Sequence, residues 1–225
     1  MKTILIVGGS KGIGAAIVNA LKSTHNVITI SRTECESKEN TKQFILDVLE
    51  DKLPEIDTLD GLVYCPGSIN LKPFKRLTLD DFSDDFKINV LGAIKVIKKY
   101  EKVLSANNGS VVLFSTVATQ MGMPFHASIA VSKAGVEGLA KSLAAEYATK
   151  IRFNVIAPTV TDTPLAARLL RNDKQKEVMK ERHPLKQYLE PAEVASLANY
   201  LLSENAKSIS GQIFPIDAGM VTLKV

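Results

Sequence analysis

The stretch Val7-Gly8-Gly9-Ser10-Lys11-Gly12-Ile13-Gly14 decides the fold of this chain. It follows the β-rich run Thr3–Val7 and leads into a segment with helical periodicity. A strand that stops at glycines before a helix presents free backbone N–H groups and a positive dipole end, which together bind pyrophosphate. Gly8 permits the turn, Gly12 lets a phosphate approach the backbone, and Gly14 lets the helix pack on the sheet. An ordinary glycine-rich turn is the alternative, but the position after the first strand favours a nucleotide site.

Strand-like and helix-like segments alternate along the rest of the chain, without repeats. This alternation implies right-handed crossovers and a parallel sheet covered on both faces. We therefore expect one α/β domain over residues 1–225, a Rossmann-type doubly wound parallel sheet of about seven strands. Only residues 33–42 separate the second and third strands, so the helix between them is short or absent. The predicted strands are Thr3–Val7, Asn26–Ile30, Gln43–Val48, Gly61–Cys65, Ser110–Ser115, Ile151–Ala157 and Gln212–Ile216, and the predicted helices are Ile13–Leu21, Leu79–Leu104, Ser128–Ala148 and Pro191–Leu202.

Composition excludes several function classes. The net charge of +4 comes from scattered lysines, so we expect no nucleic-acid partner. The apolar runs are far shorter than the roughly 20 residues that cross a bilayer, so no membrane association is expected. Cys35 and Cys65 form no CxxC pair, no metal site is predicted, and Met1-Lys2-Thr3 leads directly into a strand without a signal peptide. These features favour a reducing, cytoplasmic location.

The end of the second strand indicates which nucleotide binds. NAD sites usually place an acidic residue there for the ribose 2′-hydroxyl, whereas a cation suits the 2′-phosphate of NADP. Here the strand ends in Ser31-Arg32-Thr33, and Lys11 lies in the glycine loop. A guanidinium binds phosphate through two hydrogen bonds, and Lys11 adds a second positive charge. The sequence favours NADP(H) over NAD(H), although Arg32 as a merely solvated loop residue remains an alternative.

These segments, taken in order, resemble the short-chain dehydrogenase/reductase family over nearly the whole chain. The glycine loop resembles the family's Thr-Gly-x-x-x-Gly-x-Gly, with Val7 at the threonine position. Tyr64-Cys65-Pro66-Gly67 stands in place of Asn-Asn-Ala-Gly. The residues 157–163 are similar to the loop that touches the nicotinamide, with Thr159 where glycine is usual. Residues 190–195 and 210–212 are also family-like.

The resemblance implies a set of site residues. Asn89, Thr116 or the neighbouring Ser115, and Lys133 fall at family active-site positions. Thr163 is expected to bond the nicotinamide carboxamide, although it also suits an N-cap before Pro164, and both roles are compatible. The expected cofactor-binding residues are Gly8, Ser10, Lys11, Gly12, Ile13, Gly14, Ser31, Arg32, Thr33, Asp47, Val48, Cys65, Pro66, Gly67, Lys133, Pro158, Val160, Thr161 and Thr163.

The catalytic segment departs from the family. Members use a Tyr-x-x-x-Lys pair on one helix face, where the ammonium lowers the pKa of the phenol that exchanges the substrate's proton. Here Lys133 is kept but Ile129 occupies the tyrosine position, and isoleucine has no proton to exchange.

Three explanations of this departure stay open. In the first, another group supplies the proton; His126 is the candidate, and Tyr64 and Ser128 are weaker ones. In the second, a reactive substrate tolerates the loss of a donor that contributes typically 10²–10⁴-fold. In the third, the protein binds NADP(H) without turnover, as a sensor or assembly protein.

Substrate and assembly are only broadly predictable. The segment 164–185 mixes apolar and charged residues, which indicates a helical lid over a partly apolar pocket for a small or medium carbonyl or alcohol. The helix Ser128–Ala148 is rich in alanine and glycine, which permits close helix–helix approach. Because the family often pairs this helix across subunits, a homodimer or homotetramer is expected.

Overall fold

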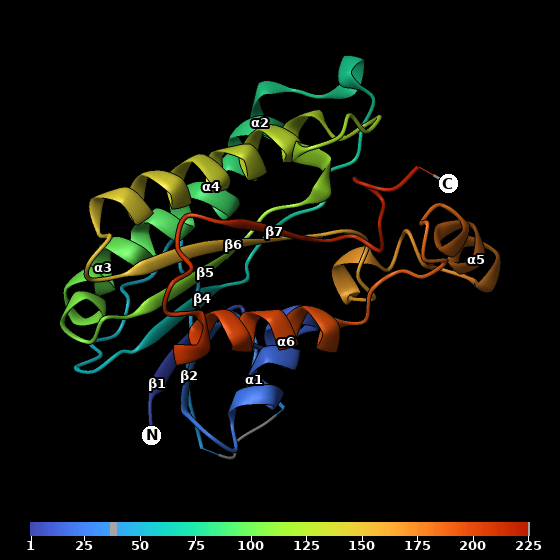
Figure 1. Ribbon diagram of the computed structural model, residues 1–225. Coiled ribbons are helices and arrows are strands. Elements are labelled where there is room, and N and C mark those ends of the chain that lie inside the picture. The colour runs from blue at the N-terminus through green and yellow to red at the C-terminus, as the bar shows by residue number, and fades with distance from the viewer. Residues whose placement is uncertain (37–39, 225) are drawn as a thin grey trace.

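The computed structural model describes residues 1–36 and 40–224. Seven strands of this part of the chain form one parallel sheet in the order β3-β2-β1-β4-β5-β6-β7 (Figure 1). The expected doubly wound sheet is thereby confirmed. The strands are β1 (Thr3–Val7), β2 (Asn26–Ser31), β3 (Thr41–Ile45), β4 (Gly61–Tyr64), β5 (Ser110–Phe114), β6 (Arg152–Pro158) and β7 (Ile213–Ile216). The α-helices are α1 (Gly12–Leu21), α2 (Leu79–Phe86), α3 (Gly92–Ala106), α4 (Ala127–Glu146), α5 (Asp173–Glu181) and α6 (Pro191–Leu202).

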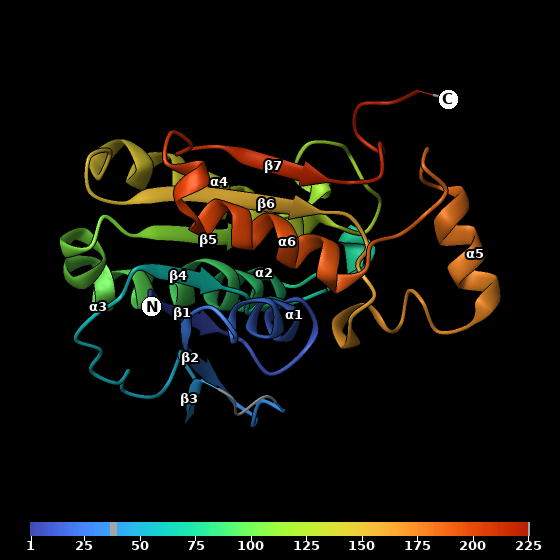
Figure 2. The same ribbon diagram turned by 60° about the horizontal axis from the view of Figure 1, so that its bottom comes forward.

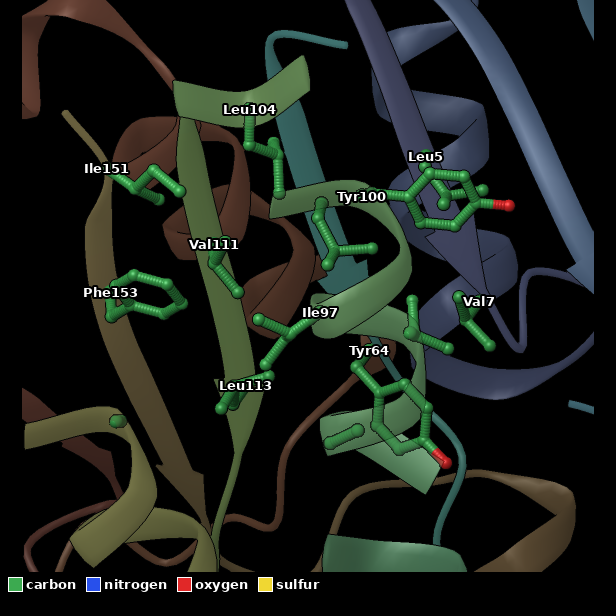
Figure 3. Packing of buried hydrophobic residues seen from close by; sticks show 14 of the residues in the cluster. Leu5, Val7, Tyr64, Ile97, Tyr100, Leu104, Val111, Leu113, Ile151 and Phe153 are labelled. Carbon is green, nitrogen blue, oxygen red and sulfur yellow. The ribbon is translucent and has the colours of Figure 1, made fainter. Parts of the chain in front are cut away.

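Two helical layers cover the two faces of the sheet. Helices α1 and α6 pack together on one face, and α2, α3 and α4 lie on the other (Figures 1 and 2). Side chains of β1 alternate between these layers, as a strand requires. Ile4 and Ile6 join the core under α1 and α6, whereas Leu5 and Val7 join the core under α3 and α4 (Figure 3). The strand is buried on both faces, which explains its unbroken apolar sequence.

The third strand lies two to three residues earlier than predicted. Its register runs from Val27↔Thr41 to Ser31↔Ile45, so β3 stops where β2 stops. Leu46 N then donates to the Ser31 carbonyl at 3.0 Å, and the chain turns across the end of β2. Residues 37–39 of the preceding connection lie outside the described part, and its described residues contain no helix. The turn brings Asp47 and Val48 to the carboxyl edge of the sheet.

The long helix predicted over 79–104 is interrupted by a π-helical turn, Lys87–Leu91, between α2 and α3. Two side-chain hydrogen bonds to backbone carbonyls accompany the interruption, one from within the segment and one from β4. The Asn89 side chain donates through Nδ2 to the Asp85 carbonyl at 2.7 Å, and the Tyr64 hydroxyl donates to the Ile88 carbonyl at 2.7 Å. Gly92 follows because a methyl group there would lie 2.1 Å from the Tyr64 oxygen. π turns often mark functional sites, and this one carries Asn89.

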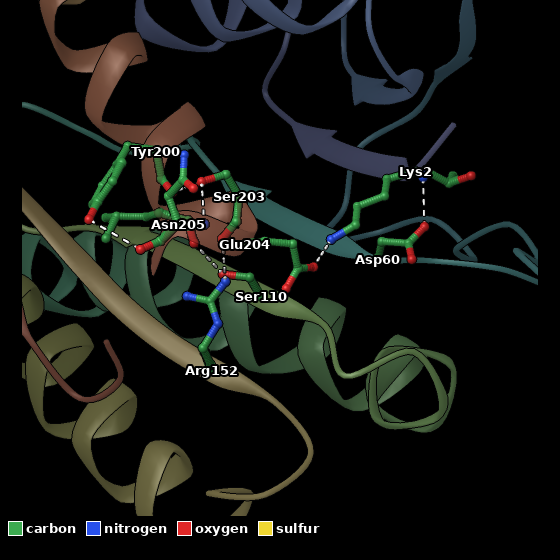
Figure 4. Close-up of polar contacts among 10 residues, drawn as sticks. Lys2, Asp60, Ser110, Arg152, Tyr200, Ser203, Glu204 and Asn205 are labelled. Atoms are coloured by element: carbon green, nitrogen blue, oxygen red, sulfur yellow. Dashed lines mark hydrogen bonds and ion pairs between the residues drawn. The ribbon is translucent and has the colours of Figure 1, made fainter. Parts of the chain in front are cut away.

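Polar contacts join the elements that meet at the amino edge of the sheet (Figure 4). Lys2 pairs with Glu204, and Thr3 N donates to an Asp60 carboxylate oxygen at 2.7 Å. Arg152 donates to the Ser203 carbonyl at 3.3 Å. The contacts of Lys2 and Arg152 tie the strand beginnings to the end of α6 and the residues that follow it, and the Thr3 contact joins β1 to the start of β4. The opposite edge is the one where such sheets bind ligands. Among the described helices, none has the length and apolar character that a membrane crossing requires.

Alanine substitutions at two glycines test whether α1 must pack closely against the glycine loop. A methyl group on Gly14 would lie 2.1 Å from the Gly8 carbonyl oxygen, a backbone atom that cannot move aside. We expect Gly14→Ala to lower the free energy of unfolding by about 2 kcal/mol or more, since overpacking costs about 1–3 kcal/mol. Gly122→Ala is the control, because a methyl there meets nothing within 4 Å. Equal urea unfolding midpoints for the two variants would contradict the expectation.

Candidate nucleotide-binding and active site

A cavity of about 480 Å³ opens at the carboxyl edge of the sheet, above β1, β2 and β4. Such an edge is where open α/β sheets bind ligands. The cavity brings together predicted residues that follow the carboxyl ends of β1, β2, β3 and β4. Thr163, which follows β6, closes the cavity on the other side. It is lined by Val7, Gly8, Ser10, Lys11, Gly12, Ile13, Gly14, Ile30, Ser31, Arg32, Thr33, Leu46, Asp47, Val48, Leu49, Cys65, Pro66, Gly67, Ile88, Thr163, Pro164 and Leu165.

The glycine loop presents its backbone to this cavity. Gly8 and Gly12 have φ values of +80° and +55°, which favour glycine. Lys11 is the N-cap of α1, and its side chain makes no capping hydrogen bond. The first N–H groups of α1 therefore remain available for an anion at the positive end of the helix dipole. This geometry fits a pyrophosphate.

The outer end of the cavity suits a phosphorylated ribose. Ser31 is buried, and its Oγ has no hydrogen-bond partner among the described residues. Lys11 and Arg32 are exposed beside it, and within the described part of the chain neither takes part in an ion pair. Thr33 Oγ1 donates to Ser10 Oγ at 2.9 Å and joins the two loops. A buried hydroxyl and two cations that line the same cavity, all without such partners among the described residues, fit a nucleotide phosphate.

The loop after β3 forms the next wall. Asp47 Oδ1 accepts from Leu49 N at 2.9 Å, and Asp47 N donates to an Asp51 carboxylate oxygen at 2.7 Å. These bonds tighten the loop and leave Val48 buried, at 7% exposure. Asp47 and Val48, both expected to bind the cofactor, thus line the cavity.

The inner end of the site holds a buried ammonium. Lys133 Nζ donates to the Phe114 carbonyl at 2.9 Å, and the residue is 9% exposed. Burial lowers the pKa of Lys133 to about 8, against the opposing effects of negative charge at Cys65 and Asp85. A methyl group on Gly67 would lie 3.4 Å from Lys133 Nζ and 3.2 Å from Asn89 Oδ1. Gly67 therefore keeps space open between these two polar groups.

The two candidate hydroxyls have different surroundings. Ser115 is buried and donates to Glu137 Oε1 at 2.5 Å, so its hydroxyl is occupied by α4. Thr116 is half-buried, and its side chain accepts from Ala118 N at 3.3 Å. Its hydroxyl proton has no acceptor among the described residues. Thr116 is thus the better placed donor to a substrate oxygen.

Ile129 and two of the alternative proton donors, His126 and Ser128, lie at the start of α4, whereas Tyr64 ends β4. Ile129 is buried, at 5% exposure, one turn before Lys133. His126 precedes the helix, and its Nδ1 lies 2.7 Å from the Pro124 carbonyl. Burial raises the pKa of Tyr64, whose hydroxyl already donates to the Ile88 carbonyl. Ser128 is fully buried.

The loop after β6 is less open than expected. Thr161 is buried and donates to the Thr159 carbonyl at 3.1 Å, and neither Pro158 nor Val160 lines the cavity. Thr163 accepts from Ala166 N at 3.3 Å, which is the predicted capping role. Thr163 also lies next to Gly12 of the glycine loop. The same residue therefore caps the following turn and lines the cavity.

Sequence reasoning missed the groups behind this surface. His183 is fully buried and lies 2.8 Å from Thr159 Oγ1 through Nε2, which ties the end of the expected lid to the β6 loop. Helix α5 lies beyond the carboxyl ends of the strands (Figures 1 and 2). Asp85 and Ser68 adjoin Asn89. Asp85 was hidden in an acidic helix, but its spacing of four residues from Asn89 was a usable signal.

Comparisons with known proteins show which proteins this chain is similar to. The family described as Enoyl-(Acyl carrier protein) reductase matches residues 38–221. A tropinone reductase homolog of Arabidopsis thaliana is 33% identical, over 97% of this chain and 91% of its own length. The solved 4-hydroxyisoleucine dehydrogenase complexed with NADH has a TM-score of 0.88 at 25% identity and covers 100% of both chains. The solved ElxO with NADP bound has a TM-score of 0.87 at 25% identity, over 99% of each chain.

The burial of Lys133 has a measurable effect on stability. A lysine whose pKa is lower in the folded chain destabilises the fold while it is charged, so the penalty is full below pH 8 and fades toward 10.5. We expect Lys133→Met to raise the free energy of unfolding at pH 7 by up to about 3 kcal/mol, with a smaller gain at pH 9.5. Denaturant unfolding at both pH values measures this. Lys141→Met, at an exposed position of the same helix, is the control. A gain that does not depend on pH would contradict the expectation.

Proposed function

This chain belongs to the short-chain dehydrogenase/reductase family, and from that premise we propose that it is an NADP(H)-dependent oxidoreductase with Lys133 as its proton donor. Its substrate is a small or medium carbonyl compound or the corresponding alcohol. The observation that carries the proposal is the buried ammonium of Lys133 beside the space that Gly67 leaves open. Ile129, one turn earlier, has no proton to give.

The choice of NADP(H) rests on the outer end of the cavity. Arg32, Lys11 and the unpartnered Ser31 hydroxyl suit a 2′-phosphate, and no carboxylate stands at the end of β2 to bind a 2′-hydroxyl. Of the similar solved structures, one holds NADH and another holds NADP, so the comparisons do not decide between the two cofactors. The choice of NADP(H) therefore rests on this chain's own residues.

The residues that line the cavity would hold NADP(H), whose nicotinamide would supply the hydride. Thr116 donates a hydrogen bond to the carbonyl oxygen, and the nearby ammonium of Lys133 favours the charge that develops on that oxygen. As the alkoxide forms, it takes a proton from Lys133 Nζ, which leaves a neutral amine. A donor with a pKa near the working pH is efficient, and burial lowers the pKa of Lys133 to about 8. In the oxidative direction the neutral amine accepts the proton.

The NADP(H) assignment predicts the effect of Arg32→Ala. Loss of a charge-assisted hydrogen bond of about 1.5–3 kcal/mol weakens NADPH binding about 10- to 150-fold, whereas NADH binding changes little. Fluorescence titration of both dinucleotides measures this. Lys207→Ala, an exposed lysine distant from the cavity lining, is the control. An unchanged preference in Arg32→Ala would show that the cofactor assignment is wrong.

The role of Lys133 predicts a pH profile. Reduction needs the protonated amine, so kcat/KM is constant below about pH 7 and falls above about pH 8. Lys133→Arg keeps the charge but does not release a proton, so reduction slows by about 10² or more and the fall near pH 8 disappears. NADPH consumption with the fastest substrate of an aldehyde and ketone panel measures both. Wild-type activity in Lys133→Arg would assign the proton to another group, His126 first.

A protein that binds NADP(H) without turnover is the second candidate, and the buried Ile129 favours it. The two functions are separated by the same panel. Saturating NADPH binding with no turnover of any carbonyl or alcohol would favour the sensor or assembly protein.

Helix α4 also supports the proposed homodimer or homotetramer. Val131, Ala134 and Gly138 are exposed at helical spacing, and no atom lies within 4 Å of a methyl group placed on Gly138. This strip of small and apolar residues allows a second copy of the helix to approach closely.

A further inference from the structure

We propose that Asp85 is a positioning residue of the active site, which acts through Ser68 to turn the Asn89 amide toward Lys133 and whose carboxylate supplies negative charge to the surroundings of that ammonium. The inference rests on the proposed function of Lys133 as a proton donor. It assigns a purpose to a carboxylate that no other part of the mechanism uses.

The burial of Asp85 sets it apart from its neighbours. It is the one buried residue of α2, at 3% exposure, in a helix whose other acidic residues face solvent or make capping contacts. Ser68 Oγ donates to Asp85 Oδ1 at 2.5 Å. Asp85 Oδ2 is buried and has no hydrogen-bond partner among the described residues. A buried carboxylate with one free oxygen is costly to keep, which argues against a purely structural role.

The contacts of Asp85 fix the direction of the Asn89 amide. Asn89 Nδ2 donates to Ser68 Oγ at 3.1 Å and to the Asp85 carbonyl at 2.7 Å. Both protons of Nδ2 are thereby used, so Oδ1 must point the other way. There it is buried and unpartnered, on the side of Gly67 where Lys133 Nζ also lies. Asp85 thus orients an acceptor toward the ammonium without touching it.

The charge of Asp85 acts on the same ammonium. Negative charge at Cys65 and Asp85 raises the pKa of Lys133 against the larger lowering effect of burial. Burial raises the pKa of the Cys65 thiol to about 12, so Cys65 is neutral at neutral pH. Glu137, one turn further along α4, is another nearby carboxylate, but it accepts hydrogen bonds from Ser115 and Thr119 and is not among the charges that shift the pKa of Lys133. Asp85 is therefore the anion that stabilises the charged form of Lys133 at neutral pH.

Asp85→Asn tests the charge, with Asp84→Asn as the matched control at a neighbouring exposed carboxylate of α2. We expect the midpoint of Lys133 titration to fall by about one pH unit in Asp85→Asn and to stay in place in Asp84→Asn. NMR of protein labelled at lysine Cε follows this midpoint directly, with the signal identified by its loss in Lys133→Arg. At pH 8.5 the lower midpoint converts to an about eightfold slower reduction. An equal midpoint in Asp85→Asn and wild type would overturn the proposal.

Ser68→Ala tests the positioning and remains informative if Asp85→Asn does not fold. It keeps the carboxylate, so the Lys133 midpoint is expected to stay, while kcat falls several-fold at every pH and Ser68→Thr restores it. Unchanged kcat in Ser68→Ala would overturn the positioning role. The NMR titration needs no turnover. A protein without activity whose Lys133 midpoint still follows Asp85 would therefore contradict the proposed function alone.

Discussion

The close approach of α1 to the end of β1 is the constraint on which the site depends. Gly14 lies against the Gly8 carbonyl, so the helix begins directly above the strand with its N–H groups facing the sheet edge. In a parallel sheet all strands end at this edge, and each contributes its following loop to one cavity. The polar contacts that tie the sheet to α6 are gathered at the opposite edge, where they do not compete with ligands.

The chemistry depends on a second balance, between burial and charge. A lysine in water would hold its proton too tightly for efficient transfer near neutral pH. Burial beside the Phe114 carbonyl lowers the pKa of Lys133 to about 8, and the negative charge of Asp85 limits that fall. In the proposed mechanism, Lys133 therefore acts as proton donor in a site that has Ile129 at the tyrosine position. The pKa of Lys133 is set by its burial and by the negative charge of Asp85.

Much of the fold followed from local patterns in the sequence. The apolar runs of β1, β4 and β5 are buried on both faces, and such runs predict parallel strands directly. The β3 boundary was misplaced because an edge strand that is partly exposed carries a weaker pattern, and its register depends on β2. The π turn was not predicted, since its cause lies in contacts with Tyr64, which is distant in sequence.

The candidate site was predictable where it is built from backbone and motif spacing, as in the glycine loop and Arg32. The site was not predictable where the role of a side chain depends on which other side chain it hydrogen-bonds. The occupation of Ser115 by Glu137 and the link from Ser68 to Asp85 depend on helix packing that spacing does not reveal. The buried state of Asp85 was the hardest to foresee, because four aspartates share its short helix.

The π turn has a consequence for how this stretch of chain can vary. Asp85, Asn89, Ala93 and Ile97 are all buried, each four residues after the last. In a regular α-helix residues spaced by four advance around the axis by about 40° at each step, so four such residues would drift off one face. The wider π turn absorbs part of that drift. The segment can therefore exchange many of its side chains but not lose a residue, because a deletion would rotate the polar pair away from the apolar stripe that follows.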